Sequence, residues 1–185
     1  MNWFGLGESF WGALIGAILT GVSAIFVMGR QLVFQRKIDD RKRLEEYLKE
    51  ARVLKYYLEL LITSTKSFSL LVLENEDLDS SDPRFKNKIE ENYGYAEMYY
   101  EDMEKYLNII NDIDHRYILE EMFQTYLEIK YICEQEVRYY SKRFVDRQTF
   151  GTGDLLNDAA EKLNQLKETL SKSIDSSEKR LSKLK

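Results

Sequence analysis

The chain opens with one long apolar stretch. Ser9 to Gly29 holds 21 residues without a charge, and a helix of that length is about 30 Å long at 1.5 Å per residue. This matches the hydrocarbon core of a bilayer, where a helix satisfies its own backbone hydrogen bonds. The pattern therefore predicts a transmembrane anchor over residues 1–29.

Signal peptides are apolar too, but this stretch lacks their flanking residues. A secretory signal peptide carries basic residues before its apolar core, and none precedes Glu8. A lipoprotein signal needs a cysteine directly after the apolar run, but the chain's single cysteine is Cys133. A buried central helix of a soluble bundle stays open as an alternative.

A basic segment over residues 30–43 follows the apolar stretch. Two aspartates reduce its six basic residues to a net charge of +4, and these basic residues are Arg30, Arg36, Lys37, Arg41, Lys42 and Arg43. Positive residues stay on the cytoplasmic side, so we expect the N-terminus outside and the remainder in the cytoplasm. The segment either recognises anionic lipid headgroups or only sets this topology. Nucleic acid is not expected as a partner, because the patch is short and the whole chain has a net charge of −5.

Small residues repeat inside the apolar stretch. Gly12, Gly16 and Thr20 are four residues apart, and an adjoining strip carries Ala13, Ala17 and Gly21. Such strips let two helix backbones approach closely in lipid. They predict a homo-oligomer, and the alternative is a helix that merely tolerates small residues.

From Leu44 onward the apolar residues follow a heptad. One set recurs every seven residues at Leu44, Ala51, Leu58, Thr65 and Val72, and a second set interleaves at Tyr47, Leu54, Leu61 and Phe68. This spacing predicts a coiled-coil-like seam on a helix that continues from the membrane. Residues 74–83 are acidic and aperiodic, so they predict a loop.

Three further helices are expected, separated by turns at residues 111–114 and 149–154. Their apolar stripes run from Phe85 to Ile113, from Leu119 to Phe144 and from Leu156 to Leu184. In the second turn, Gly151 and Gly153 are candidates for positive φ, and Thr152 or Asp154 for a cap. The predicted fold is all-α: a transmembrane helix continuing into an antiparallel, up-down-up-down four-helix bundle over residues 44–185. The alternative is an extended antiparallel coiled coil that completes its core by dimerising.

Little in the composition supports catalysis. The chain has one His and one Cys, which excludes most metal and nucleophile arrangements, so no cofactor, metal or catalytic residue is expected. His115 and Cys133 lie about five helical turns apart, too far to meet on one continuous helix. Cys133 falls on an apolar stripe and is interpreted as a buried hydrophobic residue.

Tyrosine and acidic residues are concentrated in the middle of the chain. Ten of the 13 tyrosines lie between residues 93 and 140, and residues 74–128 hold 16 acidic residues against five basic ones. Tyrosine is enriched at protein interfaces. A protein-binding surface is therefore predicted on the second and third helices, formed by Tyr93, Tyr95, Tyr100, Tyr131 and Tyr139. The alternative is that these rings fill boundary positions and the acidic residues only solvate the domain.

The run from Phe10 to Ala17 (FWGALIGA), followed by an apolar stretch and by Gln35, Arg36 and Lys37, is similar to the N-terminal anchors of small single-span bacterial proteins of uncharacterised function. The resemblance implies a bacterial or phage-encoded inner-membrane protein whose bulk lies in the cytoplasm. Together these features predict a membrane-anchored, non-enzymatic interaction module that self-associates. Two alternatives are a membrane-active effector or small channel subunit, and a ligand sensor with a pocket among the bundle's tyrosines.

Overall fold

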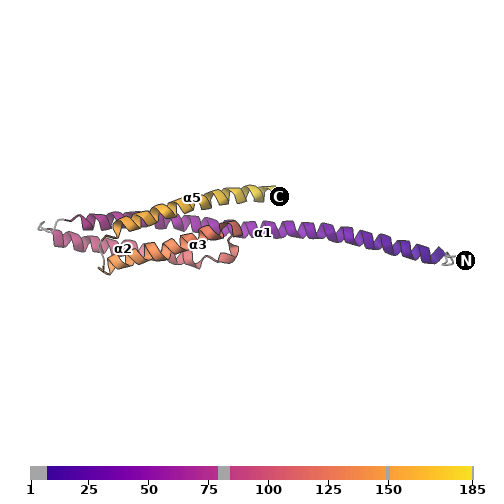
Figure 1. The fold of residues 1–185 in the computed structure, drawn as a ribbon, viewed down its shortest axis with the longest axis horizontal. Coiled ribbons are helices and arrows are strands. Elements are labelled where there is room, and N and C mark those ends of the chain that lie inside the picture. The colour runs from indigo at the N-terminus through magenta and orange to yellow at the C-terminus, as the bar shows by residue number, and fades with distance from the viewer. Residues whose placement is uncertain (1–7, 79–83, 149–150, 185) are drawn as a thin grey trace. The chain divides into compact units, whose positions relative to one another are not determined.

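The computed structural model describes residues 8–78, 84–148 and 151–184, and all of their secondary structure is helical (Figure 1). This confirms the predicted all-α class. The main helices are α1 (Glu8–Glu76), α2 (Phe85–Asp112), α3 (Phe123–Ile132), α4 (Tyr139–Val145) and α5 (Gly153–Lys183). Two 3₁₀ turns, η1 (His115–Tyr117) and η2 (Glu120–Met122), precede α3, and a π-helical segment, η3 (Cys133–Arg138), joins α3 to α4.

The chain divides into two compact units, and α1 contributes to both. Residues up to Arg43 form the first unit, and Leu44–Lys183 form the second, called the bundle below. The heptad explains where the bundle begins. One heptad before Leu44 and Tyr47 the equivalent positions are Lys37 and Asp40, whose charges are costly to bury. The bundle core therefore starts at Leu44.

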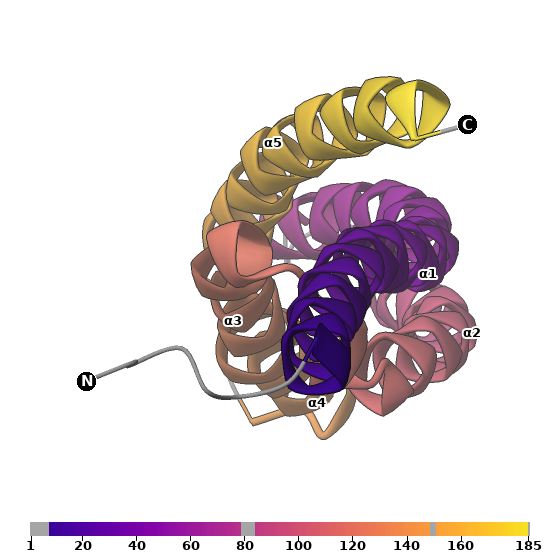
Figure 2. The same ribbon diagram turned by 90° about the vertical axis from the view of Figure 1, so that its right-hand side faces the viewer.

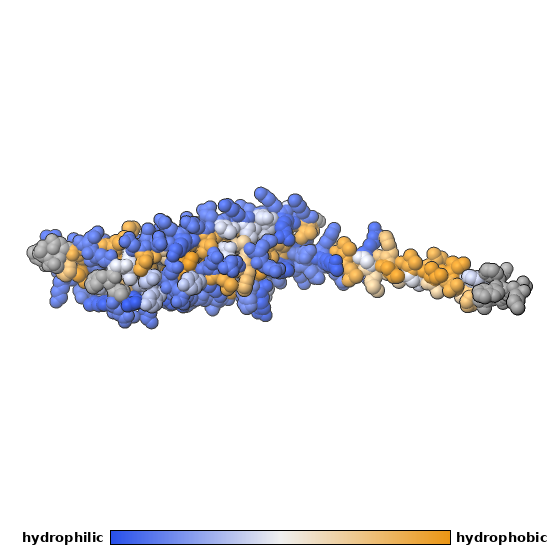
Figure 3. All heavy atoms as spheres, viewed as in Figure 1, coloured by the Kyte–Doolittle hydropathy of each residue, from blue (hydrophilic) through white to orange (hydrophobic). Residues whose placement is uncertain are grey.

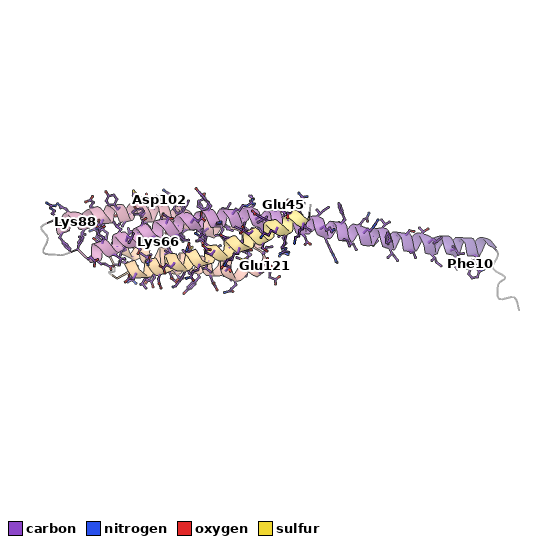
Figure 4. All side chains as sticks on the ribbon, turned by 90° about the horizontal axis from the view of Figure 1, so that it is seen from above. Phe10, Glu45, Lys66, Lys88, Asp102 and Glu121 are labelled. Carbon is purple, nitrogen blue, oxygen red and sulfur yellow. The ribbon has the colours of Figure 1, made fainter. Side chains whose placement is uncertain are left out.

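The bundle has the predicted up-down-up-down arrangement. The Tyr47 and Ser173 hydroxyls are 2.7 Å apart, and the Ser69 hydroxyl donates to the carbonyl of Gly153 at 2.7 Å, so α1 and α5 run antiparallel. α2 packs against η3 and α4, and α5 packs against α3 and η3. Figure 2 shows these helices arranged around a common centre. Lys66, Lys88 and Glu121, which are labelled in Figure 4, are examples of the exposed charged side chains of these helices.

The heptad seam of α1 is buried along its whole length inside one chain. Each of its residues is at most 4% exposed, and they are Leu44, Tyr47, Ala51, Leu54, Leu58, Leu61, Thr65, Phe68 and Val72. Across the seam, Phe68 meets the ring of Phe144 edge to face at a centroid distance of 5.7 Å. The seam therefore needs no second chain to be buried, which favours the four-helix bundle over the coiled coil that completes its core by dimerising.

The segment between α2 and α3 differs from the sequence-based expectation. A helix was expected from Asp114 onward, but α3 begins at Phe123 after the two 3₁₀ turns. Asp114 caps η1, because its carboxylate accepts a hydrogen bond from the backbone N–H of Arg116 at 2.9 Å. α1 also extends to Glu76, so the loop expected from residue 74 begins later.

The π-helical segment has a packing reason. Ile129, Cys133, Val137 and Ser141 all face the core and are spaced four residues apart. In an α-helix this spacing drifts by about 40° per step, because a turn takes 3.6 residues. The wider π turn, with i→i+5 hydrogen bonds, keeps these side chains on one face.

The start of α5 is held against the end of α1. Gly151 has a φ of +84°, as predicted, whereas Gly153 is the first helical residue and no positive φ is found there. A Cβ on Gly153 would lie 2.6 Å from Cγ of Leu73, so the two helices touch through this glycine. The Glu76 carboxylate accepts from the N–H groups of Gly151 (2.7 Å) and Thr152 (3.3 Å), while the buried Thr152 hydroxyl has no hydrogen-bond partner among the described residues. The predicted Thr152 side-chain cap is therefore replaced by Glu76.

Candidate functional site

The first unit presents an uncovered apolar helix. Its large side chains from Phe10 to Phe34 are between 39% and 74% exposed, with Ile25 the most exposed. An 18-residue window of this helix has a mean hydropathy of 2.0 and is not buried at all. Figure 3 shows this helix mostly in the hydrophobic colour. In the part of the chain that the structure describes, one helix is long and apolar enough to cross a membrane, and it is this apolar part of α1.

The predicted helix-packing residues lie on this exposed helix. A Cβ added to Gly12, Gly16 or Gly21 would meet nothing within 4 Å, and Ala13, Ala17 and Thr20 are exposed as well. The Thr20 hydroxyl donates to the carbonyl of Gly16 at 2.7 Å, so its polar group is satisfied within the helix. The strips are therefore open to a second helix, and self-association remains a prediction.

The basic segment is a continuous, exposed part of α1. It holds the six predicted residues Arg30, Arg36, Lys37, Arg41, Lys42 and Arg43. The guanidinium carbon of Arg30 lies 5.3 Å from the ring centroid of Phe26, one turn nearer the N-terminus. Leu32, Val33 and Phe34 follow Arg30 and are more than half exposed, so apolar and basic side chains share this part of the helix.

The structure does not join the five predicted tyrosines into one surface. Tyr93 is only 9% exposed, because its ring packs on Phe144 at 5.1 Å and under the Arg147 guanidinium at 4.5 Å. Its assignment to a binding surface is therefore corrected to a core position. Tyr95, Tyr131 and Tyr139 are 48%, 63% and 47% exposed, as expected for surface residues.

Tyr100 belongs to a half-buried polar network between α2 and η3. Its hydroxyl donates to Glu104 at 2.9 Å, and burial together with this bond raises the pKa of Tyr100 to about 12. The Arg138 guanidinium donates to Glu104 (2.9 Å), Glu134 (2.7 Å) and Asn108 (2.7 Å). Because each of its three nitrogens donates to a carboxylate or amide oxygen, Arg138 fixes α2 and η3 to each other.

A groove between α3 and α5 was not predicted from the sequence. It has a volume of about 560 Å³ and is lined by Gln124, Leu127, Glu128, Tyr131, Ile132, Glu136, Lys162, Gln165 and Leu166. Leu127 and Tyr131 are exposed and lie four residues apart on its α3 side, and Phe123, one turn earlier on α3, is exposed as well. Lys162 spans the groove to Glu136 at 2.9 Å, and this bond raises the pKa of Lys162. The signal was present in the sequence as a second apolar stripe beside the buried stripe of the third helix.

The void beside Tyr47 and Tyr126 in the bundle interior is small. The void lined by Tyr126 has a volume of about 10 Å³, at the lower limit for a single water molecule. Ligand pockets are usually at least about 300 Å³. The Tyr126 hydroxyl is also engaged, donating to the carbonyl of Ile113 at 2.5 Å. This part of the core gives the ligand-sensor alternative no support.

Cys133 is fully buried, and burial raises the pKa of its thiol to about 12. It therefore stays a neutral thiol and packs as a small hydrophobic side chain, as the sequence indicated. His115 is exposed on η1, next to Asp114. Among residues 8–78, 84–148 and 151–184, no group of three or more His, Cys, Asp or Glu side chains is placed to hold a metal ion.

A scan against protein-family models finds no matching family, and searches of curated proteins and of solved structures find no significant match. The resemblance to single-span bacterial anchors is thus neither supported nor contradicted. The features that bear on function are accordingly the exposed apolar helix, the basic segment and the groove.

Proposed function

We propose that this protein is a membrane-anchored, non-enzymatic helical interaction module of the bacterial inner (plasma) membrane. The apolar part of α1 crosses the bilayer with its N-terminus outside, and the bundle lies in the cytoplasm. The span self-associates, and the bundle binds a protein partner.

One observation carries this proposal: an apolar helix of membrane-spanning length whose large side chains, among the described residues, are all exposed. Burying apolar area contributes roughly 25 cal/mol per Å², so a stretch of about 20 exposed apolar residues is strongly unfavourable in water. Soluble monomers rarely expose apolar patches larger than a few hundred Å². Insertion into lipid removes this exposure.

A charge placed in the span tests the anchor directly. In Leu19→Arg/Val22→Arg two arginines lie near the middle of the apolar stretch, and each costs about 2.5–3.5 kcal/mol in membrane insertion. The matched control is Leu70→Arg, because Leu70 is on the same helix and is similarly exposed (68% against 62% and 61%) but belongs to the bundle. We expect the double variant to leave the membrane pellet after ultracentrifugation, and the control to remain there. Wild-type protein in the supernatant would refute the proposal.

The orientation has its own test. Protease added outside intact spheroplasts should leave the bundle uncut, and the same protease should digest it after lysis. The basic segment is the reason for this expectation, since Lys and Arg flanking a span stay on the cytoplasmic side. Digestion in intact spheroplasts would reverse the proposed topology.

Substitutions of the small residues in the span test self-association and distinguish the interaction module from the membrane-active effector. Gly16→Leu and Ala17→Leu should reduce crosslinked oligomers of the full chain in membranes, whereas Ile18→Leu, which keeps a large side chain, should not. If overexpression also causes ion leakage that these variants abolish, the membrane-active effector is favoured. If an unrelated span preserves function, the effector idea is lost.

The α3–α5 groove is the part of the bundle best suited to a partner, because it combines apolar side chains with a polar rim. A photo-crosslinking residue in place of Tyr131 should give a discrete adduct in cells. The same residue in place of Tyr56, which is also exposed (57%) but lies on α1, should not. Equal labelling at both positions would argue against a specific docking surface.

A further inference from the structure

Arg30 is turned toward the apolar segment. Helical side chains point toward the N-terminus of their helix, and the 5.3 Å distance to the Phe26 ring places this guanidinium one turn back from its own Cα. From Phe10, a hydrocarbon core of about 30 Å ends near residue 29. In the inserted helix the Arg30 charge therefore lies where acyl chains meet headgroups.

A cation at that depth needs an anion, because an unpaired charge is costly away from water. Neighbours three and four residues away are the ones a helical side chain can reach. For Arg30 these are Phe26, Val27, Val33 and Phe34, none of which is acidic. The helix thus supplies an aromatic and aliphatic surround, and the counter-charge has to come from the membrane.

Lys37 lies on the same face as Arg30. Seven residues make almost two turns, so the two side chains leave the helix only about 20° apart, whereas Arg36 lies about 120° from Arg30. Phe34 stands between Arg30 and Lys37 and is 64% exposed. Lys37 is about 10 Å beyond Arg30 along the axis and its side chain also points back, so both cations face the headgroup layer.

We propose that the face formed by Arg30, Phe34 and Lys37 binds an anionic phospholipid. The Arg30 guanidinium binds its phosphate, Lys37 adds a second positive charge about 10 Å along the same face, and Phe26, on the apolar side of Arg30, packs against its acyl chain. A zwitterionic lipid fits less well because its own ammonium group competes with these cations for the phosphate. This inference rests on the proposed membrane anchoring and adds the lipid class that the anchor selects.

Native mass spectrometry of the full-length protein tests the proposal. The protein is released from detergent micelles doped with equal amounts of phosphatidylglycerol and phosphatidylcholine. We expect phosphatidylglycerol adducts to predominate severalfold. Arg30→Gln and Lys37→Gln should each lower the ratio of the two adducts about fivefold, as a loss of about 1 kcal/mol per basic residue implies.

Arg36→Gln is the matched control, because it removes the same charge at almost the same depth from another face. The adduct ratio should stay unchanged in this variant, and an equal drop in Arg36→Gln and Lys37→Gln would overturn the proposal in favour of diffuse attraction. Excess inorganic phosphate should not displace the lipid, and full displacement would also overturn it.

Flotation of the same protein with phosphatidylcholine vesicles separates lipid selection from membrane anchoring. Protein that floats but shows no preference for phosphatidylglycerol overturns only this inference. Protein that does not float overturns the membrane anchor itself.

Discussion

Replacing Gly153 by Ala tests the close approach of α1 and α5. A Cβ at this position would lie 2.6 Å from Cγ and 2.7 Å from Cδ2 of Leu73, and 3.3 Å from the Leu73 backbone nitrogen. Cγ is one bond from the Leu73 Cβ, so the overlap is relieved only by a new rotamer or by separation of the helices. Overpacking of this kind costs about 1–3 kcal/mol. The helix propensity of Ala acts mainly in a helix interior, and Gly153 is the first residue of α5, so propensity offsets little of this cost and the net loss stays at about 1–3 kcal/mol.

Two further variants isolate the cause. In a Leu73→Ala background the clashing atoms are gone, so Gly153→Ala should become neutral or stabilising. Gly94→Ala is the matched control, because Gly94 is an exposed residue inside α2 whose added Cβ meets nothing within 4 Å. It should raise the free energy of unfolding by about 0.5–1 kcal/mol through helix propensity alone.

Urea denaturation of the full chain in a mild detergent, followed by far-ultraviolet circular dichroism, measures these differences as shifts of the midpoint at constant slope. The single variants Gly153→Ala and Gly94→Ala should move the midpoint in opposite directions. A rise of the midpoint in both would show that α1 and α5 do not touch at Gly153, and the described packing would be wrong.

Single side chains of the bundle give three more tests. Thr65→Val should stabilise the bundle by about 1 kcal/mol in the same urea assay, because among the described residues the fully buried hydroxyl bonds only to the weak acceptor Sδ of Met103 at 3.5 Å. Bonds from Arg116 lower the pKa of Asp114 to about 2 from its ordinary 3.8, so its contribution to stability is present above about pH 4 and is lost as the pH falls toward 2. Asp114→Asn should therefore show a weaker decline of stability over that range, and an unchanged acid profile would count against the cap. Cys133 should react with a thiol reagent only after unfolding in urea, since rapid labelling of the native protein would contradict its burial and raised pKa.

The α1 seam is the part of the fold that the sequence predicted best. Leu44, Leu58 and Phe68 could be assigned to the core because a 3-4 spacing places them on one side of any helix. The same periodicity predicted the buried stripes of the later helices, including Met103 and Ile129. These assignments need only the helical repeat, which is a local property of the chain.

Tyrosine positions were predicted less well, for a physical reason. Tyr93 and Tyr131 both lie beside an apolar stripe, where the repeat does not decide between burial and exposure. Phe144 and Arg147 cover Tyr93, whereas Tyr131 lines the open groove against α5. Whether each tyrosine is buried or exposed depends on which helix packs beside it. The sequence around Tyr93 or Tyr131 does not specify that neighbouring helix.

By itself, the sequence determined the all-α class, the membrane-length apolar helix, the basic segment and the inward face of each helix, because all of these follow from composition and short periods. Only the tertiary structure decided the contact of Gly153 with Leu73, the Arg138 network and the α3–α5 groove. Each of these joins side chains that are far apart in the chain, so each depends on how the helices are placed against one another. Helical periodicity sets the direction of a side chain, and the packing of neighbouring helices sets what that side chain meets.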